Sequence, residues 1–246
     1  MTFLRTLFNR RWWWATLLVL LAMGVMVRLS IWQLDRLAQR RAANAELQLM
    51  LDADPLVLTG AFATDTTLTQ LPNRRVTAVG EFDFSQQLAL KVQNWQGRAG
   101  IHLIAPLMLD AETAVLVDRG WIPDSEAPPE NWATYDETGP VTIDGYVALS
   151  QTLSRTAVAP PDAPQQEWFR VDIAAIQPQM PYRLLPIYIL QSPAGDNSKL
   201  PFRAEPEIDL SEGPHLSYAI QWLLFTVILG GGYLYFVRKN SAPSAS

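Results

Sequence analysis

The chain has 246 residues, of which 49% are hydrophobic and 17% charged, and it contains no cysteine. Without cysteine it can form neither disulfides nor zinc–thiolate sites. Residues 42–214 hold 23 of the 24 acidic residues but only 10 of the 19 basic ones. An acidic middle argues against nucleic acid as the partner, and the basic flanks fit phospholipid headgroups.

Residues 12–34 predict a first membrane-spanning helix. Trp12-Trp13-Trp14 is typical of the aromatic belt at a membrane surface, and an apolar run follows it. A cleaved signal peptide is the alternative, but no A-x-A-type site follows the run, so we expect a retained helix. Residues 35–51 continue as a polar helix, which Asp54-Pro55 should end.

Residues 215–237 predict a second span, because they include no Asp, Glu, Lys or Arg. Two spans place the tails, residues 1–11 and 238–246, on one side of the membrane and the domain, residues 35–214, on the other. The basic residues beside the spans are nearly balanced between the two sides, with a lean toward cytoplasmic termini.

Between the spans the hydrophobic period changes to two. Alternation predicts strands at 75–82, 88–92, 115–118 and 141–147, with a further short strand at 187–190. Few helical patterns separate them, apart from a possible short helix at 171–176. We therefore expect a mainly-β, α+β domain built on an antiparallel sheet or small barrel. Residues 125–140 and 158–166 are too rich in proline for regular structure.

Catalytic motifs are missing from the sequence, which argues against an enzyme. There is no Walker-type loop, G-x-G-x-x-G, G-x-S-x-G or H-E-x-x-H. The two histidines, His102 and His215, exclude a multi-histidine metal site within one chain. His102 lies in an alternating segment and is interpreted as an exposed or hydrogen-bonded strand residue.

The start of the second span carries a polar and aromatic stripe. His215, Tyr218 and Trp222 recur at three- and four-residue spacing, so they share one helix face, with Gln221 beside them. Neutral imidazole is a common iron ligand, and the aromatic rings could flank a flat macrocycle. Ordinary placement of a histidine at the membrane surface is the alternative.

The end of the first span carries two cations beside a tryptophan. Arg28 and Arg36 flank Trp32 at i−4 and i+4, so all three project from one side of the helix. Such a group could hold two propionates, whereas snorkelling to headgroups is the alternative. In the second span, Gly230-Gly231-Gly232 permits close approach of another helix.

Five segments resemble, in the same order, the motifs of the Surfeit locus protein 1 family. They are Ile31–Arg36 (W-Q-x-x-R), Arg75–Phe82, Gly97–Leu107, Val115–Pro123 (V-x-R-G-W-I/V-P) and Gly213–Trp222 (H-x-x-Y-A-x-Q-W). Together they cover about residues 28–237. At the turn of Arg28, relatives tend to carry small or apolar residues, so Arg28 is a feature of this chain.

The resemblance implies a two-span protein of the bacterial cell (inner) membrane, with cytoplasmic termini and an extracytoplasmic domain. It implies an assembly factor for cytochrome c oxidase, not an enzyme, that assists insertion of heme a into the catalytic subunit, with heme a synthase as a further partner. His215 would be the metal ligand that binds heme a transiently. We expect the same site to be lined by Tyr218, Gln221, Trp222, Trp32, Arg36 and Arg28.

Two other functions are compatible with the same sequence. A heme-free scaffold or accessory subunit would use the same helix faces to stabilise an oxidase assembly intermediate. A membrane-anchored hydrolase or binding domain unrelated to the oxidase is more remote, because no catalytic motif supports it.

Within the domain, Gly120 predicts a backbone turn, Pro123 a strand end and Trp121 a packed corner. The alternative is that Arg119 and Trp121 face a partner.

Overall fold

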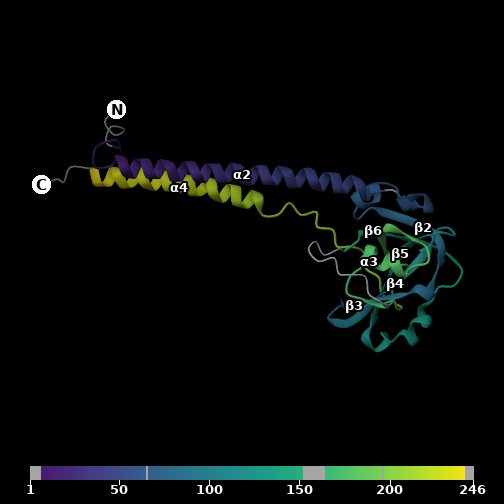
Figure 1. The fold of residues 1–246 in the computed structure, drawn as a ribbon. Coiled ribbons are helices and arrows are strands. Elements are labelled where there is room, and N and C mark those ends of the chain that lie inside the picture. Colours follow the sequence, from purple (N-terminus) through teal and green to yellow (C-terminus); the bar gives the residue numbers. More distant parts are fainter. Residues whose placement is uncertain (1–6, 65, 152–163, 196, 242–246) are drawn as a thin grey trace. The chain divides into compact units, whose positions relative to one another are not determined.

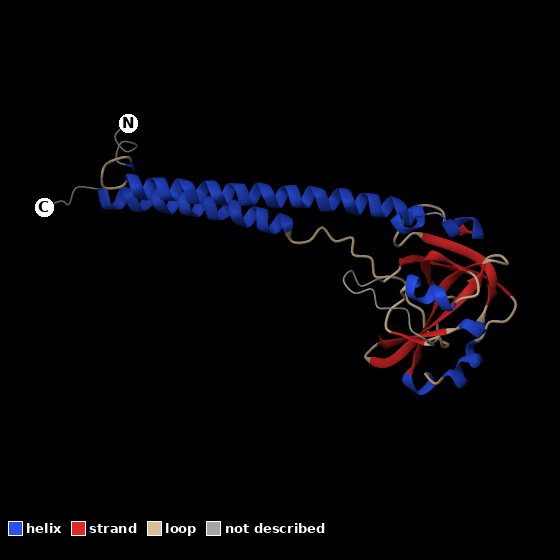
Figure 2. Ribbon diagram, viewed as in Figure 1, coloured by secondary structure: helices blue, strands red, loops and turns tan. Residues whose placement is uncertain are grey.

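The protein is described by a computed structural model over residues 7–64, 66–151, 164–195 and 197–241. It separates into two compact units. One unit spans Met50–Ile208 and contains the strands, and the other combines the residues before Met50 with those from Asp209 onward. Figure 2 shows the strands gathered in the first unit and the two long helices in the second. Each unit is considered by itself.

The helical unit consists of two long antiparallel helices that lie side by side (Figure 1). Helix α2 spans Trp13–Asp52 and helix α4 spans His215–Ser241. Each contains an apolar stretch long enough to cross a membrane, with a mean hydropathy of 2.0 in α2 and 1.6 in α4. The prediction of two helices long and apolar enough to span a membrane, the first continuing into a polar helix, is confirmed.

The strand unit is a closed barrel of five strands with three additional strands, β1, β3 and β7. Its strands are β1 (Leu56–Leu58), β2 (Arg75–Phe82), β3 (Leu88–Trp95), β4 (Arg98–Met108), β5 (Thr113–Pro123), β6 (Pro140–Leu149), β7 (Glu167–Trp168) and β8 (Arg183–Gln191). They follow the order β1-β2-β6-β8-β5-β4-β3-β7. A further pairing of β2 with β4, at Glu81–Met108 and Phe82–Leu107, closes five strands into the barrel.

Apolar side chains pack on both the inner and the outer face of the barrel. Inward side chains such as Val76, Val117 and Ile187 form the barrel core. On the outside, the short helix α3 (Ile173–Ile176) covers a second apolar cluster on β3, β4, β5 and β8. Central strands are therefore apolar on both faces, and β5 is buried along nearly its whole length.

The predicted strands are confirmed, with two corrections. Strand β5 pairs with β8 in parallel, not antiparallel. Alternation reports which face is buried but carries no information on strand direction, which depends on the long connection between the two strands. Residues 125–140 were expected to be irregular, but contain the 3₁₀ helix η5 (Pro129–Tyr135), whose proline sits in the first turn where no hydrogen bond is lost. Residues 158–163 lie outside the described residues.

Strand β5 carries a bulge at the arginine-glycine pair. Opposite β4, Leu103 pairs with Gly120 and Ile104 with Asp118, so Arg119 is the extra residue. Gly120 has a φ of +115°, which allows the bulge. Arg119 and Trp121 are both 0% exposed. The structural interpretation of this motif is therefore favoured over a partner-facing role.

Candidate functional site

Three side-chain hydrogen bonds join α2 to α4. Ser30 Oγ donates to the carbonyl of Ala219 at 2.9 Å, and both groups are buried. His215 Nδ1 lies 2.8 Å from Gln33 Oε1. Toward the other end of the pair, Thr16 Oγ1 and the Tyr233 hydroxyl are 2.6 Å apart. Polar contacts of this kind orient helices that apolar lipid alone would not align.

The His215–Gln33 and Tyr233–Thr16 contacts lie near the two ends of the apolar stretch of α4. His215 and Tyr233 are 18 residues apart, which is five helical turns, so their side chains lie on the same side of α4. The same separation is about 27 Å along the helix axis, close to the roughly 30 Å of hydrocarbon in a bilayer. In a helix pair that crosses a bilayer, this separation would place His215 at the level of one membrane surface and Tyr233 near the other.

The contact with Gln33 selects one tautomer of neutral His215. The amide oxygen of Gln33 can only accept a hydrogen bond, so Nδ1 of His215 must be the protonated ring nitrogen. The lone pair of the neutral ring is then on Nε2. Metal-binding histidines are held in the same way, by an acceptor that binds the nitrogen not used for the metal. The residues present at His215 thus fit an iron ligand.

Packing against α2 buries only part of the polar and aromatic stripe predicted on α4. Ala219 is the buried residue of this turn, at 3% exposure. Trp222 is half-buried, seven residues beyond His215, and lies on the same side as that histidine. Tyr218 is 47% exposed. Gln221 is exposed, and its position two residues after Ala219 places it about 200° around the helix, away from α2.

The predicted group on α2 faces away from α4. Arg28 and Trp32 are each two residues from the buried Ser30, about 200° around the helix from the contact face. Arg36 is exposed and donates to Gln39 Oε1 at 3.1 Å. The structure therefore brings none of the three into contact with His215. Their role toward propionates stays a prediction, and it would require a ligand that extends around α2.

Sequence reasoning missed Gln33, the residue in direct contact with His215. The signal was present, because an amide side chain in an apolar span needs a hydrogen-bond partner within the protein. What the spacing could not supply was the register between two helices separated by a whole domain. That register pairs Gln33 with His215, and Ser30 with Ala219.

Beyond the span, the segment before α4 is held against α2 by charged groups. Arg41 forms a two-bonded pair with Glu212, at 2.7 and 2.9 Å. Arg40 binds Asp209 and the carbonyl of Ser211. The Arg41 hydrogen bond lowers the pKa of Glu212. Hydrogen bonds from Ser211 are the largest cause of the lowered pKa of Asp209, to which Arg40 adds.

Acidification should release residues 209–212 from α2. Because both carboxyl pKa values are lowered by folding, their stabilising effect is present above the ordinary carboxyl pKa and is lost as the pH falls through the lowered values. Hydrogen exchange in the peptide 208–214, corrected for intrinsic rate, should be faster at about pH 3 than at about pH 6. Arg40→Gln with Arg41→Gln should show the fast exchange at both values. Unchanged protection in that variant would contradict the role of these pairs.

The second histidine is a structural residue of the barrel. His102 Nδ1 lies 2.8 Å from Asp118 Oδ2, and the carboxylate also accepts the amide N–H of Gly120 at 3.0 Å. The interpretation of His102 as an exposed or hydrogen-bonded strand histidine is confirmed in its hydrogen-bonded form. Among the described residues, no group of three or more His, Cys, Asp or Glu side chains could hold a metal ion.

Comparison with known proteins assigns the chain to a family. The sequence model of the SURF1 family matches residues 20–227. The chain belongs to the SURF1 family. The resemblance of the five motifs is thereby confirmed, and the matched region includes both Gln33 and His215. The two long apolar helices are those expected of a membrane protein.

Individual SURF1 relatives are similar at modest identity over most of the chain. A SURF1-like protein of Monosiga brevicollis is 26% identical over 231 residues, covering 88% of this chain and 85% of the relative. A SURF1-like protein of Rickettsia felis is 24% identical over 229 residues, covering 91% and 96%. Surfeit locus protein 1 of Mus musculus is 27% identical over 180 residues, covering 67% and 56%.

Proposed function

We propose that this chain is an assembly factor for cytochrome c oxidase that binds heme a transiently through His215 and assists its insertion into the catalytic subunit. SURF1-family proteins are known as cytochrome c oxidase assembly factors, which supports the general role. The observation that carries the heme-binding part is the hydrogen bond between His215 and Gln33, at 2.8 Å. It prepares Nε2 of His215 as an iron ligand at the level of a membrane surface.

A single histidine suits delivery better than permanent binding. His215 is the one histidine of the two helices, so this chain would supply one axial bond, and heme held by one protein ligand is more easily released to an acceptor. Bound heme supplies an iron that accepts the imidazole lone pair. The half-buried Trp222 lies two turns along the same side of α4 and would offer an aromatic surface to a heme bound at His215.

The remaining parts of the chain fit the same role. The helix pair would hold the protein in a bacterial inner membrane with both termini in the cytoplasm, and the barrel would contact the oxidase and heme a synthase outside it. The chain connects the barrel to a helix at each end, because α2 precedes the barrel in the sequence and α4 follows it. No part of this role requires catalysis by the chain itself, and we propose that it is not an enzyme.

The test is the heme content of the purified protein. Wild type, His215→Ala and His102→Gln should be purified from cells that make heme a, and their pyridine hemochrome spectra compared. We expect heme a in wild type, its loss in His215→Ala, and no change in His102→Gln, which removes the other histidine. Gln33→Leu keeps the ligand but frees the ring, so its heme affinity should fall by about 10- to 100-fold.

Other outcomes distinguish the alternatives. Equal heme in wild type and His215→Ala would place the ligand elsewhere. No heme in either protein, with normal folding and with oxidase assembly still dependent on the gene, would favour a heme-free scaffold. A Gln33→Leu variant with unchanged affinity would show that the hydrogen bond does not prepare His215 for binding.

A further inference from the structure

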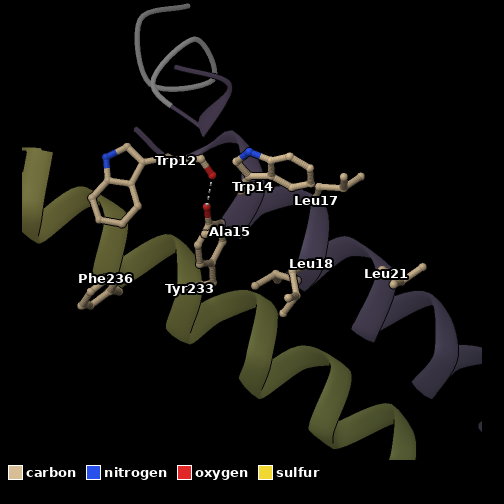
Figure 3. Close-up of a pocket in the computed structure, with 9 residues that line it drawn as sticks. Trp12, Trp14, Ala15, Leu17, Leu18, Leu21, Tyr233 and Phe236 are labelled. Atoms are coloured by element: carbon tan, nitrogen blue, oxygen red, sulfur yellow. Dashed lines mark hydrogen bonds between the residues drawn. The ribbon is translucent and has the colours of Figure 1, made fainter. Parts of the chain in front are cut away.

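An apolar groove lies on the flank of the helix pair, near the end opposite His215 (Figure 3). It has a volume of about 690 Å³, and its walls include Trp14, Leu18 and Leu21 from α2 and Tyr233 and Phe236 from α4. We call it the lateral groove. Among its lining residues, Ala15 is 18 residues before Gln33 and Trp14 is 18 residues before Trp32, so the groove extends from the Gln33 side of α2 to the Trp32 side.

The walls of the lateral groove are held in place by contacts within the helix pair. The Tyr233 hydroxyl lies 2.6 Å from Thr16 Oγ1 and 3.4 Å from the carbonyl oxygen of Trp12, so its polar end is satisfied inside the pair. Figure 3 shows this hydroxyl pointing toward the Trp12 carbonyl. Phe236 packs edge-on against Trp12, with ring centroids 5.7 Å apart. The α4 wall of the groove is therefore held in place, and the groove presents hydrocarbon to an occupant.

The shape of the groove suits a hydrocarbon chain rather than another helix. From Trp14 to Leu21 it follows about 10 Å of α2, starting at the aromatic belt. A docked helix requires small side chains so that backbones can approach. In the lateral groove Ala15 is the one small lining residue, and the open glycines Gly231 and Gly232 are not part of it.

Four basic residues are close in sequence to the lining residues Trp12 and Phe236. Arg10 and Arg11 precede α2, Arg238 and Lys239 follow Phe236, and all four are exposed. The Arg11 guanidinium lies over the Trp12 ring at 5.2 Å from its centroid. No Asp or Glu occurs in residues 1–34 or 215–246, so these cations have no acidic side chain of either terminal segment to neutralise them. An anionic group at the headgroup level would be attracted here.

We propose that the lateral groove is a binding site for one anionic phospholipid. One acyl chain lies along Leu18 and Leu21, and the phosphate is bound at the mouth by Arg11 and Arg238. The bound lipid covers the apolar flank of the pair and stabilises the register that aligns Gln33 with His215 five turns away. This site does not depend on heme binding, and it can be tested in protein free of heme.

The test measures lipid retained by the full chain. Wild type is placed in nanodiscs of phosphatidylcholine with a small fraction of phosphatidylglycerol, then released and analysed by native mass spectrometry. We expect one retained phosphatidylglycerol per chain, in preference to phosphatidylcholine. Arg11→Gln with Arg238→Gln should weaken its binding roughly 30-fold. The matched control, Arg75→Gln with Arg183→Gln, removes the same charge from exposed barrel positions and should leave binding unchanged.

A second pair of variants tests the groove itself. Ala15→Phe places a large side chain in the groove and should abolish lipid retention, whereas Ala38→Phe, at an exposed position of α2 beyond the span, should not. Equal retention of both lipids, unaffected by the arginine variants, would overturn the proposal. So would full displacement of phosphatidylglycerol by inorganic phosphate, which would indicate a free-anion site. A dimer that Ala15→Phe disrupts would show instead that the groove docks a helix.

Discussion

Replacing Gly120 with alanine is expected to lower the free energy of unfolding of the barrel by about 3–5 kcal/mol. Gly120 has a φ of +115°, which side chains rarely adopt. A Cβ at this position would lie 2.6 Å from the carbonyl oxygen of Phe202 and 2.9 Å from Arg203 Cγ. The backbone of Phe202 cannot move away freely, because it exchanges two hydrogen bonds of 2.8 Å with Trp121.

The matched control for this variant is Gly139→Ala. Gly139 also has a positive φ, +85°, but its Cβ would meet no atom within 4 Å. It therefore isolates the backbone strain, with an expected loss of about 1–2 kcal/mol. Both variants can be compared by chemical unfolding of the full chain in detergent, followed by near-ultraviolet circular dichroism. Equal losses for the two would show that the contact with Phe202 contributes nothing.

Replacing Arg119 with alanine is expected to cost a similar amount, about 3–5 kcal/mol, because it removes one partner from a buried charged network. Arg119 is fully buried. Its Nη1 donates to Gln87 Oε1 at 2.9 Å, and its Nη2 donates to the carbonyl of Tyr135. Its guanidinium lies 4.7 Å from the centroid of Phe84. Burial lowers the pKa of Arg119, and the nearby charges of Glu137 and Asp136 oppose that shift.

The loss should depend on pH in a defined direction. Burial raises the pKa of Asp136, and the charge of Arg119 lowers it again. Without Arg119, the pKa of Asp136 in the folded state rises further above its unfolded value. Such a shift stabilises the fold below the unfolded pKa, and the stabilisation is lost as the pH rises through the folded pKa. Variants that lack Arg119 should therefore unfold more easily as the pH rises through the range where Asp136 ionises.

A double variant separates charge from packing. Arg119→Met retains most of the apolar volume beside Phe84, so its defect should arise from the lost hydrogen bonds to Gln87 and Tyr135 and from Asp136, which loses the opposing charge. Adding Asp136→Asn should recover part of the lost stability and remove the added pH dependence. If the double variant is as unstable as Arg119→Met at every pH, the network acts through its hydrogen bonds to Gln87 and Tyr135 rather than through charge.

In this motif, the sequence predicted a structural role but not the burial of Arg119. The sequence predicted a turn at Gly120 and a packed Trp121, since glycine and tryptophan have strong local preferences. It gave no indication that Arg119 is buried, because arginine is usually exposed. The bulge decides this by turning Arg119 into the barrel wall, where carbonyl, amide and carboxylate groups from distant segments meet it.

The sequence by itself determined the elements: two apolar spans, a polar continuation of the first, and short alternating strands. Each is encoded by a local period, 3.6 for helices and two for strands. The tertiary structure alone decided how they meet. Closure of β2 on β4, the parallel pairing of β5 with β8, and the contact of Gln33 with His215 all join residues far apart in the chain. Local periodicity shows which residues share a face, but the face that is buried depends on the partner. On α4 that partner packs on the small Ala219, so Tyr218 and Gln221 are left exposed.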